Sequence, residues 1–256
     1  MILFVFEGER REPMLFKSIE HLFFPSNGEN IICSFGNNIY ELYRQMHSMG
    51  EGADIVGVLK ENGAISIDYD MADFSDVFLF FDLDIHNENQ AMETSAAQIA
   101  EMLSYFDNET ETGKLFINYP MIESIYHTST LPDNEYWQYT VPISDCSDYK
   151  RIARDFPPYS NLDHLCVTDR NRTREDMVKR IRTNWIHLIG MNIQKANMLC
   201  MGRHEKPTQK DDISQSNIFS AQLKDFIEIN QQISVLNAFP LFLYDYFKPG
   251  TFELSR

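Results

Sequence analysis

The sequence predicts an α/β fold, in which a largely parallel β-sheet is flanked by helices and followed by a helical C-terminal extension. Short apolar runs rich in strand-forming residues recur along the first half of the chain, and segments with helical spacing separate them. Strands and helices that alternate in this way are typical of parallel-sheet units. The alternation stops near residue 130, and this change predicts the extension.

Four apolar runs are expected to form the strands of this sheet. They cover residues 2–6, 30–35, 77–81 and 114–118. The first, ILFVF, is apolar throughout, as in a strand buried on both faces, and the third, VFLFF, is the strongest strand signal in the chain. Between the second and third runs, residues 54–73 predict a short helix followed by a strand near Ile65–Ile67.

Helical spacing of apolar residues, with proline or asparagine near the start, predicts the intervening helices. One begins near Pro13, and the next is capped by Asn37 or Asn38. A third covers Glu88–Phe106, and a short one starts at Pro120.

The second half of the chain has a different character. Residues 131–165 are irregular and rich in proline, whereas residues 173–199 and 214–236 each have the spacing of a helix. We therefore divide the chain into an α/β domain, residues 1–130, and a mostly helical extension, residues 131–256, that binds substrate or a partner. Near its end, Phe239, Phe242, Tyr244, Tyr246 and Phe247 are expected to pack in the core; a homo-oligomer contact is the alternative.

Composition limits the classes of function. Hydrophobic residues make up 43% of the chain, which is enough for a sizeable core. The formal net charge of −16 counts against a simple nucleic-acid-binding protein, because such a chain repels phosphates at long range. It leaves open a nuclease whose acidic residues hold divalent cations.

The cysteines and the N-terminus indicate a cytoplasmic protein. The four cysteines, Cys33, Cys146, Cys166 and Cys200, lack the spacing of zinc ligands and are expected to be reduced thiols. No apolar run approaches the ~18 residues of a membrane span, and Glu7 interrupts the first run in a chain start that lacks the basic residues of a signal peptide. No membrane partner is expected.

Two of the predicted strands end in acidic residues. Glu7 follows the first strand, and Asp82 and Asp84 end the third. Functional groups of open α/β sheets collect at the carboxyl ends of strands, and alternate residues of an extended chain face the same side. Asp82 and Asp84 are therefore expected to point into one crevice, with Glu7 facing them if the two strands are neighbours.

Three carboxylates packed together repel one another, and a divalent cation removes this penalty. Mg²⁺ and Mn²⁺ prefer such hard oxygen ligands. We therefore predict that Glu7, Asp82 and Asp84 are ligands of Mg²⁺ or Mn²⁺, and that Gly8 leaves room for backbone or phosphate to approach. The alternative is that each acid is a solvated turn residue.

Three segments carry a resemblance to a known family. FVFEGERREPMLF, VFLFFDLD and LFINYPMIES resemble the motifs of TOPRIM domains, and most closely those of RloB-like proteins among the OLD-type nucleases. The resemblance covers about residues 1–130 and implies a TOPRIM-type sheet. It also implies that Glu7 is the principal acid, as general base or metal ligand, and that Asp82 and Asp84 are metal ligands. Glu12 and Glu123 would complete a second metal site or orient a ligand.

One departure from the family pattern concerns the second acid. Many TOPRIM nucleases place it four residues after the first, where this chain has Arg11, and Glu12 comes one residue later. The number of metal ions, one or two, therefore stays open.

The resemblance implies a metal-dependent nuclease that cleaves DNA or RNA, with tRNA among the candidate substrates, as an effector of anti-phage defence. It also implies an ATPase partner, because the chain has no G-x-x-x-x-G-K-[ST] loop of its own. Two alternatives remain. The first is a non-catalytic, TOPRIM-shaped regulatory or binding subunit, and the second is a phosphohydrolase that uses Asp82 as its nucleophile.

Basic residues supply candidate contacts to nucleic acid. Arg10 and Arg11 follow the first acid and could grip a scissile phosphate or balance nearby acids. The segment from Arg170 to Arg182 is a local basic cluster in an acidic chain, with Arg172, Arg174 and Arg180 as candidate contacts. A solvated helix face, or one paired with a partner chain, is the alternative for this cluster.

Overall fold

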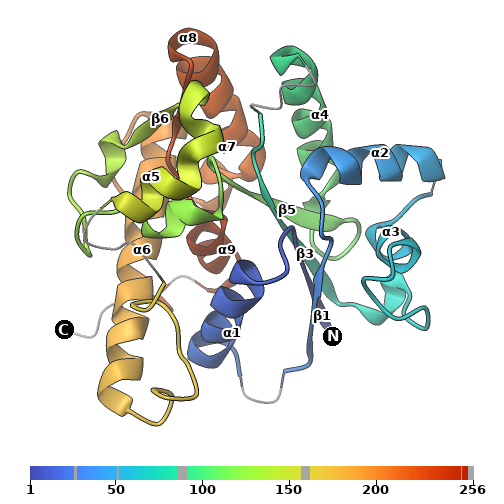
Figure 1. The fold of residues 1–256 in the computed structure, drawn as a ribbon, viewed down its shortest axis with the longest axis horizontal. Helices are drawn as coiled ribbons and strands as arrows, with labels where there is room; N and C mark the ends of the chain where they lie inside the picture. Colours follow the sequence, from blue (N-terminus) through green and yellow to red (C-terminus); the bar gives the residue numbers. More distant parts are fainter. Residues whose placement is uncertain (26–27, 51, 86–90, 157–161, 249, 253–256) are drawn as a thin grey trace.

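The structure, a computed structural model, describes residues 1–25, 28–50, 52–85, 91–156, 162–248 and 250–252. It confirms an α/β fold with a mostly parallel sheet, flanking helices and a helical C-terminal region (Figure 1). Within the described residues, no helix combines the length and the apolar composition needed to cross a bilayer.

Five strands form the main sheet, in the order β2-β1-β3-β5-β4. They are β1 (Ile2–Phe6), β2 (Asn30–Ser34), β3 (Asp76–Asp82), β4 (Asp107–Asn108) and β5 (Gly113–Asn118). The first three and β5 run parallel, and the short β4 pairs antiparallel at one edge. Phe6 pairs with Phe80, so the carboxyl ends of β1 and β3 lie side by side, as the acidic-site prediction requires.

Helices cover both faces of this sheet. Those from the first half are α1 (Arg11–Phe23), α2 (Ile39–Met49), α3 (Ile55–Glu61), α4 (Met92–Tyr105) and two short 3₁₀ helices, η1 (Met71–Asp73) and η2 (Ile122–Tyr126). In Figure 1, α2, α3 and α4 lie on one side of the sheet, and α1 lies on the other. The Asn38 side chain accepts the Glu41 N–H at 3.0 Å, so Asn38 rather than Asn37 is the cap of α2.

The C-terminal half contains more than helices. Its elements are η3 (Tyr136–Gln138), β6 (Thr140–Pro142), η4 (Ile143–Asp148), α5 (Tyr149–Asp155), α6 (Glu175–Met201), η5 (Lys210–Ile213), α7 (Gln215–Ala221), the π-helix η6 (Gln222–Ile227), α8 (Glu228–Asn230), β7 (Gln232–Ser234) and α9 (Ala238–Tyr246). Strands β6 and β7 pair antiparallel in a small second sheet.

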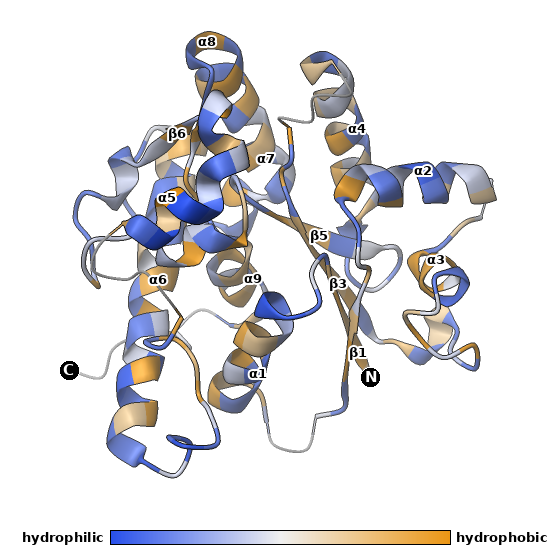
Figure 2. Ribbon diagram, viewed as in Figure 1, coloured by the Kyte–Doolittle hydropathy of each residue, from blue (hydrophilic) through white to orange (hydrophobic). Residues whose placement is uncertain are grey.

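The last helix returns to the main sheet and completes its core. The Phe239 ring stacks on Phe80 with centroids 4.9 Å apart, and Phe242 meets Phe78 at the same distance. Figure 2 shows the central strands as the most hydrophobic part of the fold. The expected core role of Phe239 and Phe242 is thus confirmed, because both are fully buried. The division at residue 130 and a homo-oligomer remain predictions.

Three secondary-structure predictions were wrong. Residues 131–165, which were expected to be irregular, contain β6 and the helix α5. Ile65–Ile67 forms no strand: within the described residues it pairs with no other strand, and Ile67 is 75% exposed. The single helix expected over residues 214–236 ends at Asn230, because Gln231 takes a left-handed backbone with φ of 51° and the chain then enters β7. Pairing with the distant β6 overrides the local helical spacing there. The helix expected over Glu88–Phe106 is confirmed from Met92 onward, and residues 88–90 lie outside the described residues.

Candidate functional site

The side chain of Glu7 reaches the backbone of Asp82 where β1 and β3 end. The backbone N–H of Glu7 donates to the carbonyl of Phe80 at 3.0 Å, so Glu7 continues the pairing of the two strands. Its carboxylate then bends toward β3, and Oε2 accepts the backbone N–H of Asp82 at 2.9 Å. The adjacent parallel strands therefore bring the side chain of one predicted metal ligand, Glu7, to the backbone of another, Asp82.

Asp82 is fixed by three further elements. Its Oδ1 accepts hydrogen bonds from Asn118 Nδ2 at 3.0 Å and from the backbone N–H of Ile122 at 2.9 Å. Asn118 in turn accepts the backbone N–H of Ala238, the first residue of α9, at 3.0 Å. With 6% of its surface exposed, Asp82 is a buried, well-anchored carboxylate that links β3, β5, η2 and α9.

Asp84 reaches the same region by a different route from the one expected. Strand β3 ends at Asp82, and Asp84 has a left-handed backbone with φ of 44°. The alternation of an extended strand therefore does not set its direction, and that part of the prediction was wrong. Its charge still raises the pKa of both Glu7 and Asp82, so Asp84 belongs to the acidic group.

Glu12 joins the group from the first turn of α1. It is 5% exposed, and its Oε1 accepts the backbone N–H of Gly8 at 3.1 Å. A β-carbon on Gly8 would lie 2.8 Å from Glu12 Oε2. The space beside Gly8, which we expected backbone or phosphate to use, is therefore filled by the Glu12 carboxylate.

Replacing Gly8 with alanine is expected to displace this carboxylate and break its bond to the backbone. We expect the free energy of unfolding to fall by about 1–2 kcal/mol, because Glu12 is buried and has little space to move. Gly190→Ala is the matched control: this glycine lies within α6 with no atom near its missing β-carbon. The control should gain ~0.5–1 kcal/mol in urea denaturation, and a change of the same sign in both variants would contradict the close contact at Gly8.

Glu123 and Arg11 form an ion pair at the edge of the group. Glu123 is 1% exposed, and its Oε1 accepts a hydrogen bond from Nη1 of Arg11. Its Oε2 is buried and finds no hydrogen-bond partner within the described part of the chain. Arg11 therefore balances an acid, which is the alternative expected of it, and its contact with phosphate stays a prediction.

Burial and mutual repulsion raise the pKa values of three acids of this site, Glu7, Asp82 and Glu12. Burial raises the pKa of Glu7 to about 8, and the charges of Asp84 and Glu12 add to the shift. Burial, followed by repulsion from Glu7, Glu12, Glu123 and Asp84, holds the pKa of Asp82 well above its usual value. Burial and then Glu123 also raise the pKa of Glu12. These five carboxylates, which we call the acidic site, would be stabilised as anions by a cation.

The acidic site suits a hard divalent cation in its chemistry but is not a finished metal centre. No group of three or more His, Cys, Asp or Glu side chains among the described residues is already arranged as a metal site. Glu7, Asp82 and Glu12 each turn one oxygen onto an N–H group. The candidate metal ligands are carboxylate oxygens, the ligand type that Mg²⁺ and Mn²⁺ prefer. One of them is the unpartnered Oε2 of Glu123.

Lys150 is a basic residue of the site that the sequence reasoning missed. It lies on α5, which packs against η2, and its charge lowers the pKa of both Glu7 and Glu12. The side chain is exposed, so it remains accessible to a ligand. The signal available in the sequence was the adjacent pair Lys150–Arg151 in an acidic chain, but only the fold brings it to the acids.

The arginine segment 170–182 lies away from the acidic site. Arg172 pairs with Asp169 at 3.1 Å and Arg174 with Asp176 at 3.6 Å, while Arg180 is exposed. Arg182 donates to the carbonyl of Leu22, at the end of α1 opposite to Glu12. Since α1 has 13 residues, about 20 Å separate its two ends (Figure 1). Contact of this segment with nucleic acid stays a prediction, as it does for the exposed Arg10, but the segment does not line the acidic site.

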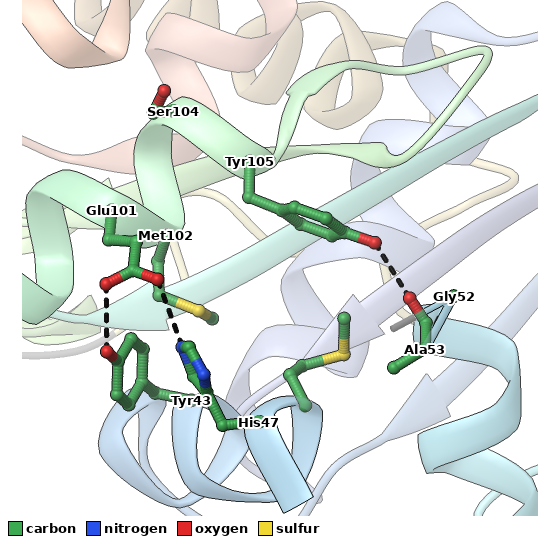
Figure 3. Close-up of a pocket in the computed structure, with 9 residues that line it drawn as sticks. Tyr43, His47, Gly52, Ala53, Glu101, Met102, Ser104 and Tyr105 are labelled. Atoms are coloured by element: carbon green, nitrogen blue, oxygen red, sulfur yellow. Dashed lines mark hydrogen bonds and ion pairs between the residues drawn. The ribbon is translucent and has the colours of Figure 1, made fainter. Parts of the chain in front are cut away.

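A cavity of about 410 Å³ lies elsewhere, between α2 and α4 (Figure 3). Glu101 accepts a hydrogen bond from the Tyr43 hydroxyl at 2.8 Å and lies 3.1 Å from Nε2 of His47, and Tyr105 donates to the carbonyl of Ala53. The residues that line it include a carboxylate but no lysine or arginine, so it is poorly suited to a phosphodiester.

Comparison with known proteins adds no family assignment: no family model, no curated protein and no solved structure matches this chain. The resemblance to TOPRIM nucleases therefore rests on the sequence motifs, and the membership it implies stays a prediction.

Proposed function

We propose that this chain is a metal-dependent nuclease that cleaves phosphodiester bonds in DNA or RNA with Mg²⁺ or Mn²⁺, and tRNA is among its candidate substrates. One observation carries the proposal: β1 and β3 are parallel neighbours, and the carboxylate of Glu7, which follows β1, accepts the backbone N–H of Asp82, the last residue of β3, at 2.9 Å. A half-buried and a buried carboxylate with raised pKa values, Glu7 and Asp82, are a costly arrangement that cation chemistry explains.

Each residue of the site then has a role. Glu7, Asp82 and Asp84 would hold the cation, and Glu12 and Glu123 would lie around them as further acids. A bound divalent cation supplies polarisation of the phosphodiester and a water of lowered pKa. Lys150, exposed beside the acids, would bind a phosphate oxygen and offset the negative charge that otherwise repels the substrate.

The biological setting is proposed from the motif resemblance alone. In this setting the nuclease would act in the cytoplasm as an effector of anti-phage defence, together with an ATPase partner. An ATPase encoded beside this chain would support that setting.

The activity is tested by incubating the purified chain with labelled duplex DNA, single-stranded DNA and tRNA, in Mg²⁺, Mn²⁺ or EDTA. We expect cleavage of at least one substrate with a divalent cation and none with EDTA. The same reactions are repeated with the candidate ATPase added, since the nuclease could depend on it. Cleavage that persists in EDTA, or no cleavage in any of these reactions, would contradict the proposal.

Replacing Lys150 with alanine is expected to lower kcat/KM for cleavage about tenfold, chiefly through KM, because a charged contact to the phosphate is lost. Arg151→Ala is the matched control on the same helix, since Arg151 is exposed and pairs with Asp148 at 2.9 Å. The control should retain wild-type kinetics. Equal losses in the two variants would indicate a general effect of α5 charge and remove Lys150 from the site.

A non-catalytic regulatory or binding subunit is the second candidate, and the Arg11–Glu123 ion pair favours it because an arginine already neutralises one acid. Calorimetric titration with Mn²⁺ separates the two functions, since the binding subunit should take up no ion. The phosphohydrolase alternative fits less well. Asp82 is buried and its Oδ1 accepts two hydrogen bonds, which leaves it poorly placed for attack on a phosphate.

A further inference from the structure

Glu123 presents a buried carboxylate whose two oxygens are in different situations. Oε1 accepts a hydrogen bond from Arg11 Nη1, and the same nitrogen lies 3.4 Å from the hydroxyl of Tyr126. The side chain is only 1% exposed, and its buried Oε2 has no hydrogen-bond partner within the described residues. Such a carboxylate has one oxygen that can still accept a hydrogen bond or bind a cation.

This carboxylate belongs electrostatically to the acidic site. Asp82 Oδ1 accepts the backbone N–H of Ile122, the residue before Glu123, and the charge of Glu123 raises the pKa of both Glu12 and Asp82. Glu12 directly follows Arg11 in the first turn of α1, and the two side chains therefore approach the site from the same helix end.

Arg11 reaches the pair from solvent. Its side chain is 46% exposed, while its partner is fully buried. A guanidinium stays charged at any pH at which the protein is folded, so it neutralises Glu123 permanently. A divalent cation bound at the unpartnered Oε2 of Glu123 would lie beside this fixed positive charge and be repelled by it.

We propose that Arg11 is a built-in counter-cation of the acidic site, which neutralises Glu123 and so limits the site to one divalent ion. When the charge of Arg11 is removed, the unpartnered Glu123 carboxylate and Glu12 accept a second ion. The inference rests on the proposed function for the first ion, held by Glu7 and Asp82, and goes beyond it by fixing the stoichiometry. Arg11 is in this account a positioning residue rather than a phosphate contact.

The test counts bound Mn²⁺ by electron paramagnetic resonance and calorimetry at pH 7.5, without substrate. The wild-type chain should bind one ion, and Arg11→Gln, which keeps the length of the side chain but removes its charge, should bind two. Arg11→Lys should bind one because the charge is retained. The double variant Arg11→Gln/Glu123→Gln should return to one, since the extra carboxylate is gone. Circular dichroism verifies that each variant is folded.

Glu123→Gln alone keeps the inference testable if Arg11→Gln fails to fold. It should still bind one ion, because Glu123 is paired with Arg11 rather than with the metal. Two ions in the wild-type chain, one ion in folded Arg11→Gln, or an ion lost in Glu123→Gln would each overturn the inference while leaving the proposed nuclease intact. Absence of any bound ion in the wild-type chain would overturn the proposed function together with this inference.

Discussion

Glu7→Gln is expected to lower cleavage by about 10³-fold while the protein stays folded, because the substitution removes a charge that holds the cation and stabilises the transition state. The amide oxygen of glutamine can still accept the Asp82 N–H that Glu7 Oε2 accepts now, so the local backbone is retained. Rates are measured with saturating Mg²⁺ and Mn²⁺. Cleavage by Glu7→Gln within tenfold of wild type would remove Glu7 from the catalytic site.

The same variant has a pH-dependent effect on stability in EDTA. Burial raises the pKa of Glu7 to about 8 in the folded protein, from its ordinary value of 4.5. The protonated carboxyl therefore favours the folded state, and this contribution is full below pH 4.5 and is lost as the pH rises toward 8. Above pH 8 the wild-type chain carries a charge on Glu7 that Glu7→Gln lacks. The free energy of unfolding of the variant should therefore be about 2 kcal/mol higher than that of the wild-type chain.

Urea denaturation in EDTA at pH 4.5 and at pH 8.5 measures this difference. The gain of Glu7→Gln should appear only at the higher pH. Glu9→Gln is the matched control, since Glu9 is exposed in the same turn and should change stability at neither pH. An equal effect of Glu7→Gln at both values would show that Glu7 is not a buried titrating acid.

Asp82→Asn carries the second large expected effect. Asparagine keeps an oxygen that can accept from Asn118 and Ile122, but it has no charge for a cation. We therefore expect cleavage to fall by about 10²–10³-fold with the fold retained. Asp82→Ala should also destabilise the protein by about 2–4 kcal/mol, because both buried donors lose their acceptor.

The two Asp82 variants together separate chemistry from folding. Cleavage rates and urea denaturation are measured for both. If Asp82→Asn kept wild-type cleavage, Asp82 would be a structural anchor only. If Asp82→Ala were as stable as the wild-type chain, the hydrogen bonds from β5 and η2 would not hold this site together.

Most of the sheet could be predicted because its strands are unambiguous. Strands buried on both faces have continuous apolar sequences, and the helices between them have clear spacing, so local patterns alone separate the two. The run VFLFF and the cap at Asn38 are examples. The segment over 214–236 could not be read correctly, because β7 exists only through its pairing with β6, some ninety residues earlier in the chain.

The acidic site was partly predictable for the same reason. Acids that end buried strands can be read from the sequence, and parallel neighbours then bring Glu7 and Asp82 together. The contributions of Lys150 and of the Arg11–Glu123 pair depend on contacts between distant segments. The direction of Asp84 depends on a left-handed residue that strand periodicity does not describe.

The central claim is that Glu7 and Asp82 share one divalent cation. It is tested most directly by crystals of the protein grown with Mn²⁺ and measured near the manganese absorption edge. An anomalous-difference peak is expected within bonding distance of carboxylate oxygens of both residues. Well-ordered density for both side chains with no peak between them, at millimolar Mn²⁺, would contradict it.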